Sequence, residues 1–138
     1  MKKLKIINDI LLLVVTSLLT NIQLSGRLIH EIMGITMFLL IFIHIALHWK
    51  WIKQVTKNFK KVNAKTKLMY IVDIFIMIIY LGAIILGISI SNELLKLETA
   101  SNFMLMVLHI ILGRLSMIVM LVHIGLHISR KKEKIENE

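Results

Sequence analysis

Six histidines, the only ones in the chain, form the same spaced triplet twice. In each triplet thirteen residues separate the first histidine from the second and three separate the second from the third, and the second copy begins 79 positions after the first. A glycine lies four residues after each first histidine. The two sets are His30, Gly34, His44, His48 and His109, Gly113, His123, His127. Because ionisable side chains are costly in apolar stretches, this duplication predicts a buried haem or metal site.

The hydropathy of the chain predicts a membrane protein. Of the 138 residues, 57% are hydrophobic, which is too apolar for a small soluble globule. Four apolar runs approach or exceed the ~20 residues that a helix needs to cross ~30 Å of hydrocarbon. We therefore expect a single all-α domain over residues 1–138, an integral membrane four-helix bundle built from two tandem helical hairpins, with helices at about 6–24, 29–51, 68–90 and 103–128.

Basic residues collect on one predicted side of the membrane. Fourteen of the seventeen precede the first apolar run, lie between the second and third, or follow the fourth, whereas the opposite side has only Arg27 and Lys96. The positive-inside rule then places both termini in the cytoplasm and makes the chain a multi-pass protein of the plasma membrane. This distribution explains the net charge of +9 by anchoring to membrane lipid, and it argues against nucleic acid as a partner.

The spacing of the histidines predicts two pairs across the bundle. The helices that carry the triplets run parallel, and fourteen residues fall about 40° short of four turns and rise about 21 Å. His30 and His44 therefore share one helix face at two depths, as do His109 and His123. We expect His30 to face His109 near the outer surface and His44 to face His123 near the inner one. Neutral imidazoles on opposite sides of a porphyrin suit two b-type haems, with these four residues as iron ligands.

His48 and His127 leave the inner ligands ambiguous. Each lies one turn beyond the second histidine of its triplet, so this pair is an alternative set of inner ligands, separated from the outer set by about 27 Å. We favour His44 and His123, and expect His48 and His127 to bind haem propionates or to relay protons to a quinone. Anchoring at the interface beside Trp49 and Trp51 is an equally good interpretation of the third pair.

Other polar and small residues carry weaker signals. Arg114 lies in the outer half of its helix, where a haem propionate or a backbone carbonyl is expected to face it. Gly34 and Gly113 are expected to let a porphyrin face or a neighbouring helix come close. Asp9 and Asp73 lie near the inner ends of the first and third apolar runs. They either accept protons from quinol or, as we expect, are simply favourable partners of the helix dipole.

A family resemblance rests on two stretches of the chain. The string His30-Glu31-Ile32-Met33-Gly34, followed by His44-Ile45-Ala46-Leu47-His48-Trp49-Lys50-Trp51, resembles the flavinylation-associated cytochrome family of small bacterial membrane proteins. The second half is similar to that family's other histidine helix, and the paired spacing is more distantly similar to the di-haem cytochrome b of respiratory complexes. The resemblance implies four helices, two b haems and electron transfer across the membrane. It also implies an extracellular partner that carries covalently attached flavin.

These observations favour an electron-transfer subunit of an oxidoreductase system, which passes electrons from quinol or a cytoplasmic-side donor to an extracellular, flavin-bearing acceptor. Two alternatives stay open. One is a ferric-reductase-like haem domain, and the other is a transporter or sensor that binds a transition metal through its histidines. The complete absence of cysteine excludes iron–sulfur clusters and covalently attached c-type haem, so any haem would be held by coordination and packing.

Overall fold

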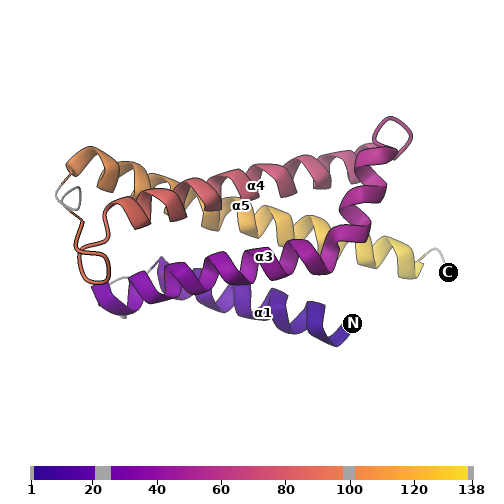
Figure 1. Cartoon of the computed structure of the whole chain (residues 1–138). Helices are drawn as coiled ribbons and strands as arrows, with labels where there is room; N and C mark the ends of the chain where they lie inside the picture. Colours follow the sequence, from indigo (N-terminus) through magenta and orange to yellow (C-terminus); the bar gives the residue numbers. More distant parts are fainter. Residues whose placement is uncertain (1, 21–25, 98–101, 137–138) are drawn as a thin grey trace.

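Apolar runs without proline fold here into long, continuous helices. In the computed structural model, residues 2–20, 26–97 and 102–136 are described. Over these residues the chain forms α1 (Lys2–Leu19), α3 (Arg27–Lys57), α4 (Ala64–Ser89) and α5 (Phe103–Glu136). Consecutive helices run in opposite directions, so α3 and α5, which carry the histidine triplets, are parallel (Figure 1). The predicted all-α fold with four helices is confirmed.

Asparagine side chains cap the starts of α4 and α5, and helix propensity extends the ends of α3 and α5. The Asn63 side chain accepts a hydrogen bond of 2.8 Å from the backbone N–H of Thr66 and caps α4, and Asn102 accepts one from Leu105 at the start of α5. Both histidine helices run beyond the apolar stretches that predicted them, α3 to Lys57 and α5 to Glu136. Hydropathy marks only the part that suits lipid, whereas Lys, Gln and Glu are good helix formers and continue the helix into water.

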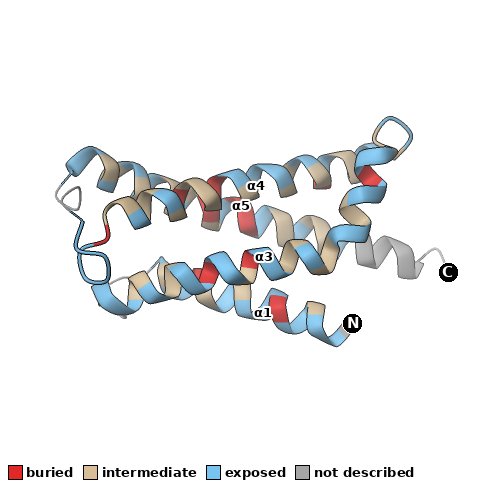
Figure 2. Ribbon diagram, viewed as in Figure 1, coloured by how far each residue is buried: buried red, intermediate tan, exposed pale blue. Residues whose placement is uncertain are grey.

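Among the described residues, three helices are long and apolar enough to cross a membrane: Arg27–Lys57, Ala64–Ser89 and the Phe103–Ser129 part of α5. Apolar side chains on these helices, such as Phe42, Ile85 and Ile118, are exposed, and exposed positions recur along the length of each helix (Figure 2). The chain is therefore a membrane protein whose helices contact lipid. α1 is not among the three, because its described 18 residues include three lysines and Asp9. The predicted first span also covers residues 21–24, which lie outside the described residues.

The four helices pack as two hairpins in tandem, α1 against α3 and α4 against α5, with α3 also contacting α4. The parallel pair α3 and α5 is not among these closely packed pairs. The buried apolar core includes Met37, Ile79 and Met120, and Met69 near the start of α4 is buried as well. These packing relations leave the two histidine helices facing each other across the bundle.

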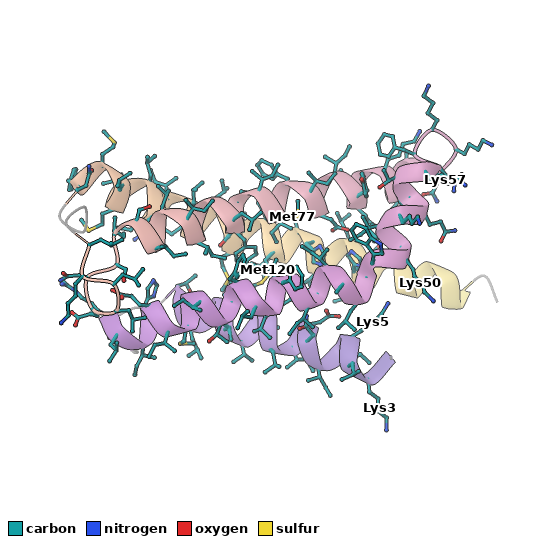
Figure 3. All side chains as sticks on the ribbon, viewed as in Figure 1. Lys3, Lys5, Lys50, Lys57, Met77 and Met120 are labelled. Carbon is teal, nitrogen blue, oxygen red and sulfur yellow. The ribbon has the colours of Figure 1, made fainter. Side chains whose placement is uncertain are left out.

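One end of the bundle collects the basic residues and both chain ends. α1 begins and α5 ends there, and the connection between α3 and α4 lies there too (Figure 1). Lys3, Lys5, Lys50 and Lys57 all lie at this end (Figure 3). α3 turns between Lys50 and Lys57 (Figure 3). Val55, which lies between them in sequence, is buried. We call this the basic end of the bundle.

Candidate functional site

His30 on α3 and His109 on α5 face each other near the end of the bundle opposite the basic end. Their ring centroids are 5.9 Å apart and the ring planes meet at 83°. Both residues are half-buried. The first of the two predicted cross-helix pairings is therefore present.

A backbone carbonyl group of α4 holds the His109 ring against that helix. Nδ1 lies 2.8 Å from the carbonyl oxygen of Ala83, and because a carbonyl only accepts, Nδ1 carries the proton. The ring also lies so close to Gly87 that an added Cβ there would be 3.0 Å from His109 Cε1. In the neutral ring this leaves Nε2 as the nitrogen with a free lone pair. The local fold thus fixes both the tautomer and the position of this imidazole.

His44 and His123 form the second predicted pair, closer to the basic end. Their ring centroids are 6.5 Å apart with an interplanar angle of 66°. His123 Nδ1 donates a hydrogen bond of 2.7 Å to Asp73 Oδ1 on α4. His44 Nδ1 lies 3.0 Å from Asp9 Oδ1 on α1. Each inner imidazole thus turns Nδ1 toward a carboxylate on the neighbouring helix of its own hairpin.

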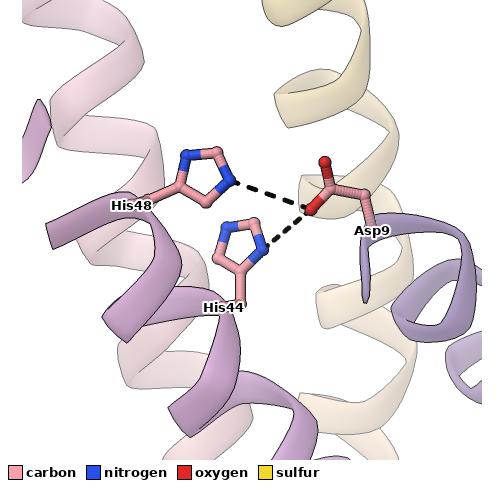
Figure 4. Close-up of side chains that lie close together, drawn as sticks. All are labelled: Asp9, His44 and His48. Atoms are coloured by element: carbon pink, nitrogen blue, oxygen red, sulfur yellow. Dashed lines mark ion pairs between the residues drawn. The ribbon is translucent and has the colours of Figure 1, made fainter. Parts of the chain in front are cut away.

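The third histidine of each triplet lies against the second, with the rings stacked in the first triplet and tilted by 40° in the second. His48 lies on His44 with centroids 4.5 Å apart, and His127 lies on His123 at 4.4 Å. Their Nε2 atoms turn toward the same carboxylates, at 4.0 Å from Asp9 Oδ1 and 3.7 Å from Asp73 Oδ1. Figure 4 shows Asp9, His44 and His48 in this arrangement. Within the part of the chain that the structure describes, no ring contact joins His48 to His127.

The two aspartates are the site residues whose role the sequence missed. The helix-dipole interpretation is wrong, since neither α1 nor α4 has an acidic residue in its first turn, and both aspartates lie against histidines instead. A signal for this was present: the dipeptide Asp-Ile occurs in the first helix of each hairpin, at 9–10 and at 73–74. It repeats along with the histidines, which a mere dipole partner need not do.

Glu31, next to His30, is a further residue to which the sequence analysis gave no role. Its carboxylate accepts hydrogen bonds from the Ser91 hydroxyl at 2.7 Å and from three consecutive backbone N–H groups, those of Asn92, Glu93 and Leu94. Such a cluster of donors around one carboxylate fixes the loop that follows α4. The loop is thereby held beside the outer histidine pair.

The middle of the bundle, between the two histidine levels, is filled by protein. Tyr80 on α4 shares a hydrogen bond of 2.9 Å with the Thr16 hydroxyl on α1 and donates to Met120 Sδ on α5 at 3.5 Å. Met37 on α3 is 2% exposed and completes this layer. Met37 and Met120 are both buried. The layer separates the outer and inner sites.

The other residues predicted to belong to the haem sites are two glycines, Gly34 and Gly113, and Arg114. An added Cβ at Gly34 or Gly113 would meet no atom within 4 Å, so open space adjoins both glycines. Arg114 is exposed on α5, and it makes no hydrogen bond or ion pair with the side chains that the structure describes. Its helix position is about 140° away from that of His109, so it does not point toward that ring, and its propionate role stays a prediction.

Comparisons with family models, with curated proteins and with solved structures find no match for this chain. Function is therefore inferred from the two levels of histidine pairs and from the carboxylates behind them.

Proposed function

We propose that this chain is a membrane cytochrome that binds two b-type haems, one at each histidine level, and carries electrons across the plasma membrane. The observation that supports this most is the pair of facing imidazoles repeated at two depths, His30 with His109 and His44 with His123. Both pairs come from the parallel helices α3 and α5. The resemblance to the flavinylation-associated cytochrome family agrees with this assignment.

The ring separations fit a shared iron. Metal–imidazole bonds are about 2 Å long, so two imidazoles that bind one ion from opposite sides have centroids roughly 6 Å apart. The observed separations are 5.9 and 6.5 Å. Helices in direct contact approach to 8–10 Å, whereas α3 and α5 are not closely packed against each other. Open space beside Gly34 and Gly113 adds to the room for a flat ligand.

The nitrogen atoms also fit. His109 and His123 each use Nδ1 in a hydrogen bond, to the Ala83 carbonyl and to the Asp73 carboxylate. A metal-bound histidine typically donates its other N–H in this way, which fixes its tautomer and orientation. His30 Nδ1 is buried without a hydrogen-bond partner. Bound haem iron supplies one-electron chemistry as it alternates between the ferric and ferrous states.

A ligand histidine should direct Nδ1 to a hydrogen-bond acceptor and leave Nε2 for the iron. This criterion favours His44 and His123 over His48 and His127 as the inner ligands. His44 and His123 turn Nδ1 toward the aspartates and keep Nε2 free. His48 and His127 turn Nε2, the outermost atom of the ring, toward those carboxylates. The first pair also makes a ring contact across the bundle. We therefore assign the inner iron to His44 and His123.

We place the basic end in the cytoplasm, with α1 as a fourth span and both termini inside. The lysines that gather at this end support that orientation through the positive-inside rule. His30 and His109 then lie near the outer surface. Electrons enter from quinol or a cytoplasmic-side donor and leave to an extracellular partner, for which a flavin-bearing protein is the candidate.

Haem content tests the proposal directly. The purified chain should hold two haems, both six-coordinate and low-spin, because four imidazoles saturate two irons. His30→Ala and His123→Ala should each reduce the content to one, and the double variant should hold none. Gly125→Ala is the control, because an added Cβ there meets nothing within 4 Å. Purified chain that carries Zn²⁺ but no haem would contradict the assignment.

A further inference from the structure

The third histidine of each triplet, His48 or His127, is not an iron ligand in the proposed haem pairs. His48 Nε2 and His127 Nε2 are both buried and have no hydrogen-bond partner. Each nitrogen points toward an aspartate at 4.0 and 3.7 Å, too far for a hydrogen bond. A buried nitrogen without a partner costs free energy unless something else satisfies it. A ligand between the nitrogen and the carboxylate would do so.

Three donor atoms converge in each hairpin. The first cluster consists of Asp9, His44 and His48, and the second of Asp73, His123 and His127, and within each cluster one ligand atom per residue lies within 4.8 Å of the others. Ligand atoms around a tetrahedral ion with bonds of about 2 Å are about 3.3 Å apart. The observed carboxylate-to-nitrogen distances range from 2.7 to 4.0 Å. This range includes the spacing of about 3.3 Å expected around a tetrahedral ion.

The donor set is chemically selective. Two imidazoles one helical turn apart and one carboxylate suit Zn²⁺ and neighbouring first-row divalent ions, whereas Mg²⁺ and Ca²⁺ prefer oxygen ligands. Three protein ligands also leave a coordination position open to water. The side chain of Asp9 is 48% exposed and that of Asp73 is 23% exposed, so an ion can reach both clusters.

We infer that the two clusters are binding sites for divalent transition-metal ions of the Zn²⁺ type, one in each hairpin. This assignment goes beyond the proposed cytochrome function and does not depend on it. The ion would replace the Nδ1 proton of His44 and of His123, which is released to solvent, and each ring becomes an imidazolate whose Nε2 stays available to iron. In this assignment Nε2 of His48 and of His127 is a ligand to the ion.

The duplication argues against a chance contact. In the first cluster 35 positions separate the aspartate from the nearer histidine, and in the second they are 50 positions apart. Tertiary packing rather than sequence spacing therefore brings the same three donor atoms together twice. A simple aspartate–histidine hydrogen bond would need no second histidine one turn away. The longer distances and greater exposure at Asp9 make this site the weaker of the two.

The test is a count of Zn²⁺ bound to the full chain. Protein stripped with a chelator and equilibrated with Zn²⁺ should retain two ions, measured by elemental analysis after gel filtration. His48→Gln and His127→Gln should each retain one, with affinity at the altered site lower by at least about tenfold. The isosteric Asp9→Asn should match His48→Gln. Glu93→Gln, which changes an exposed carboxylate on the loop after α4, should retain two.

Haem measured in the same samples separates this inference from the cytochrome proposal. Two haems without Zn²⁺, or Zn²⁺ that the His48, His127 and Asp9 variants all leave unchanged, would overturn the metal sites alone. Two Zn²⁺ without haem would support the metal sites and contradict the cytochrome. Helical content measured by circular dichroism shows whether each variant is folded. If a histidine variant does not fold, Zn²⁺ binding by the conservative Asp9→Asn variant tests the proposal instead.

Discussion

His123 on α5 donates a hydrogen bond of 2.7 Å from Nδ1 to Asp73 Oδ1 on α4. The carboxylate accepts the Nδ1–H, which fixes the tautomer of the ring and leaves the lone pair of Nε2 free to bind a ligand. A carboxylate behind a metal-bound imidazole also makes that ring a stronger donor to the metal. In the opposite hairpin Asp9 lies 3.0 Å from His44 Nδ1. Asp73 therefore orients one proposed inner ligand through a hydrogen bond, and Asp9 lies close beside the other.

Asp73→Asn should raise the reduction potential of the inner haem, because a less basic imidazole stabilises ferric iron less. Loss of a partner that orients a ligand should also weaken binding of that haem by about 10- to 100-fold. Redox titration of protein stripped of Zn²⁺ measures the potential, and haem retention during dilution measures the affinity. The outer haem is the internal control, and an equal shift at both haems would contradict a local role for Asp73.

Gly87→Ala should selectively disturb the outer haem. The new Cβ would lie 3.0 Å from His109 Cε1, so the ring or the helix must move. Overpacking of this kind costs about 1–3 kcal/mol, which corresponds to roughly 5- to 140-fold in affinity. Haem retention during dilution measures the change. Gly125→Ala introduces the same methyl group where nothing lies within 4 Å and should retain both haems.

Glu31→Ala should lower the stability of the chain. It removes the acceptor for the Ser91 hydroxyl and for three backbone N–H groups of the loop after α4. Because water replaces part of these bonds, the expected loss is about 1–2 kcal/mol. Thermal unfolding in detergent measures it as a lower Tm. Glu93→Ala, which changes an exposed side chain on the same loop, should leave Tm unchanged.

The fold could be predicted from sequence because few arrangements satisfy a backbone in lipid. Apolar runs located the helices, and the fourteen-residue spacing correctly paired His30 with His109 and His44 with His123 across the bundle. The ends of α3 and α5 were predicted too short because hydropathy does not report helix propensity in basic segments. The described part of α1 also falls short of the predicted first span.

The contacts behind the histidines could not be predicted in the same way. Asp73 and His123 are 50 positions apart, and no periodicity within one helix relates them. Their contact depends on how α4 packs on α5. The bond from His109 to the Ala83 carbonyl has no signal in sequence at all, because every residue carries such a carbonyl. Glu31 likewise depends on the path of a loop.

His44→Ala should remove the inner haem, whereas His48→Ala should leave two haems bound. The difference follows from the nitrogen that each ring turns away from Asp9: His44 keeps Nε2 free, and His48 points Nε2 at the carboxylate. Haem extraction and the reduced-minus-oxidised spectrum distinguish the variants. Loss of a haem in His48→Ala together with retention of both in His44→Ala would reassign the inner site to His48 and His127.

His109→Ala should isolate the inner haem from any acceptor outside the cell. Its ring belongs to the outer pair, on the far side of the Tyr80 layer from His44 and His123, so the inner site should stay intact. In vesicles of known orientation, quinol should still reduce the remaining haem, while reduction of a flavin protein added at the outer face should stop. Gly125→Ala is the matched control and should support normal transfer. If the His109 variant passes electrons outward at the normal rate, the outer pair is not part of the path.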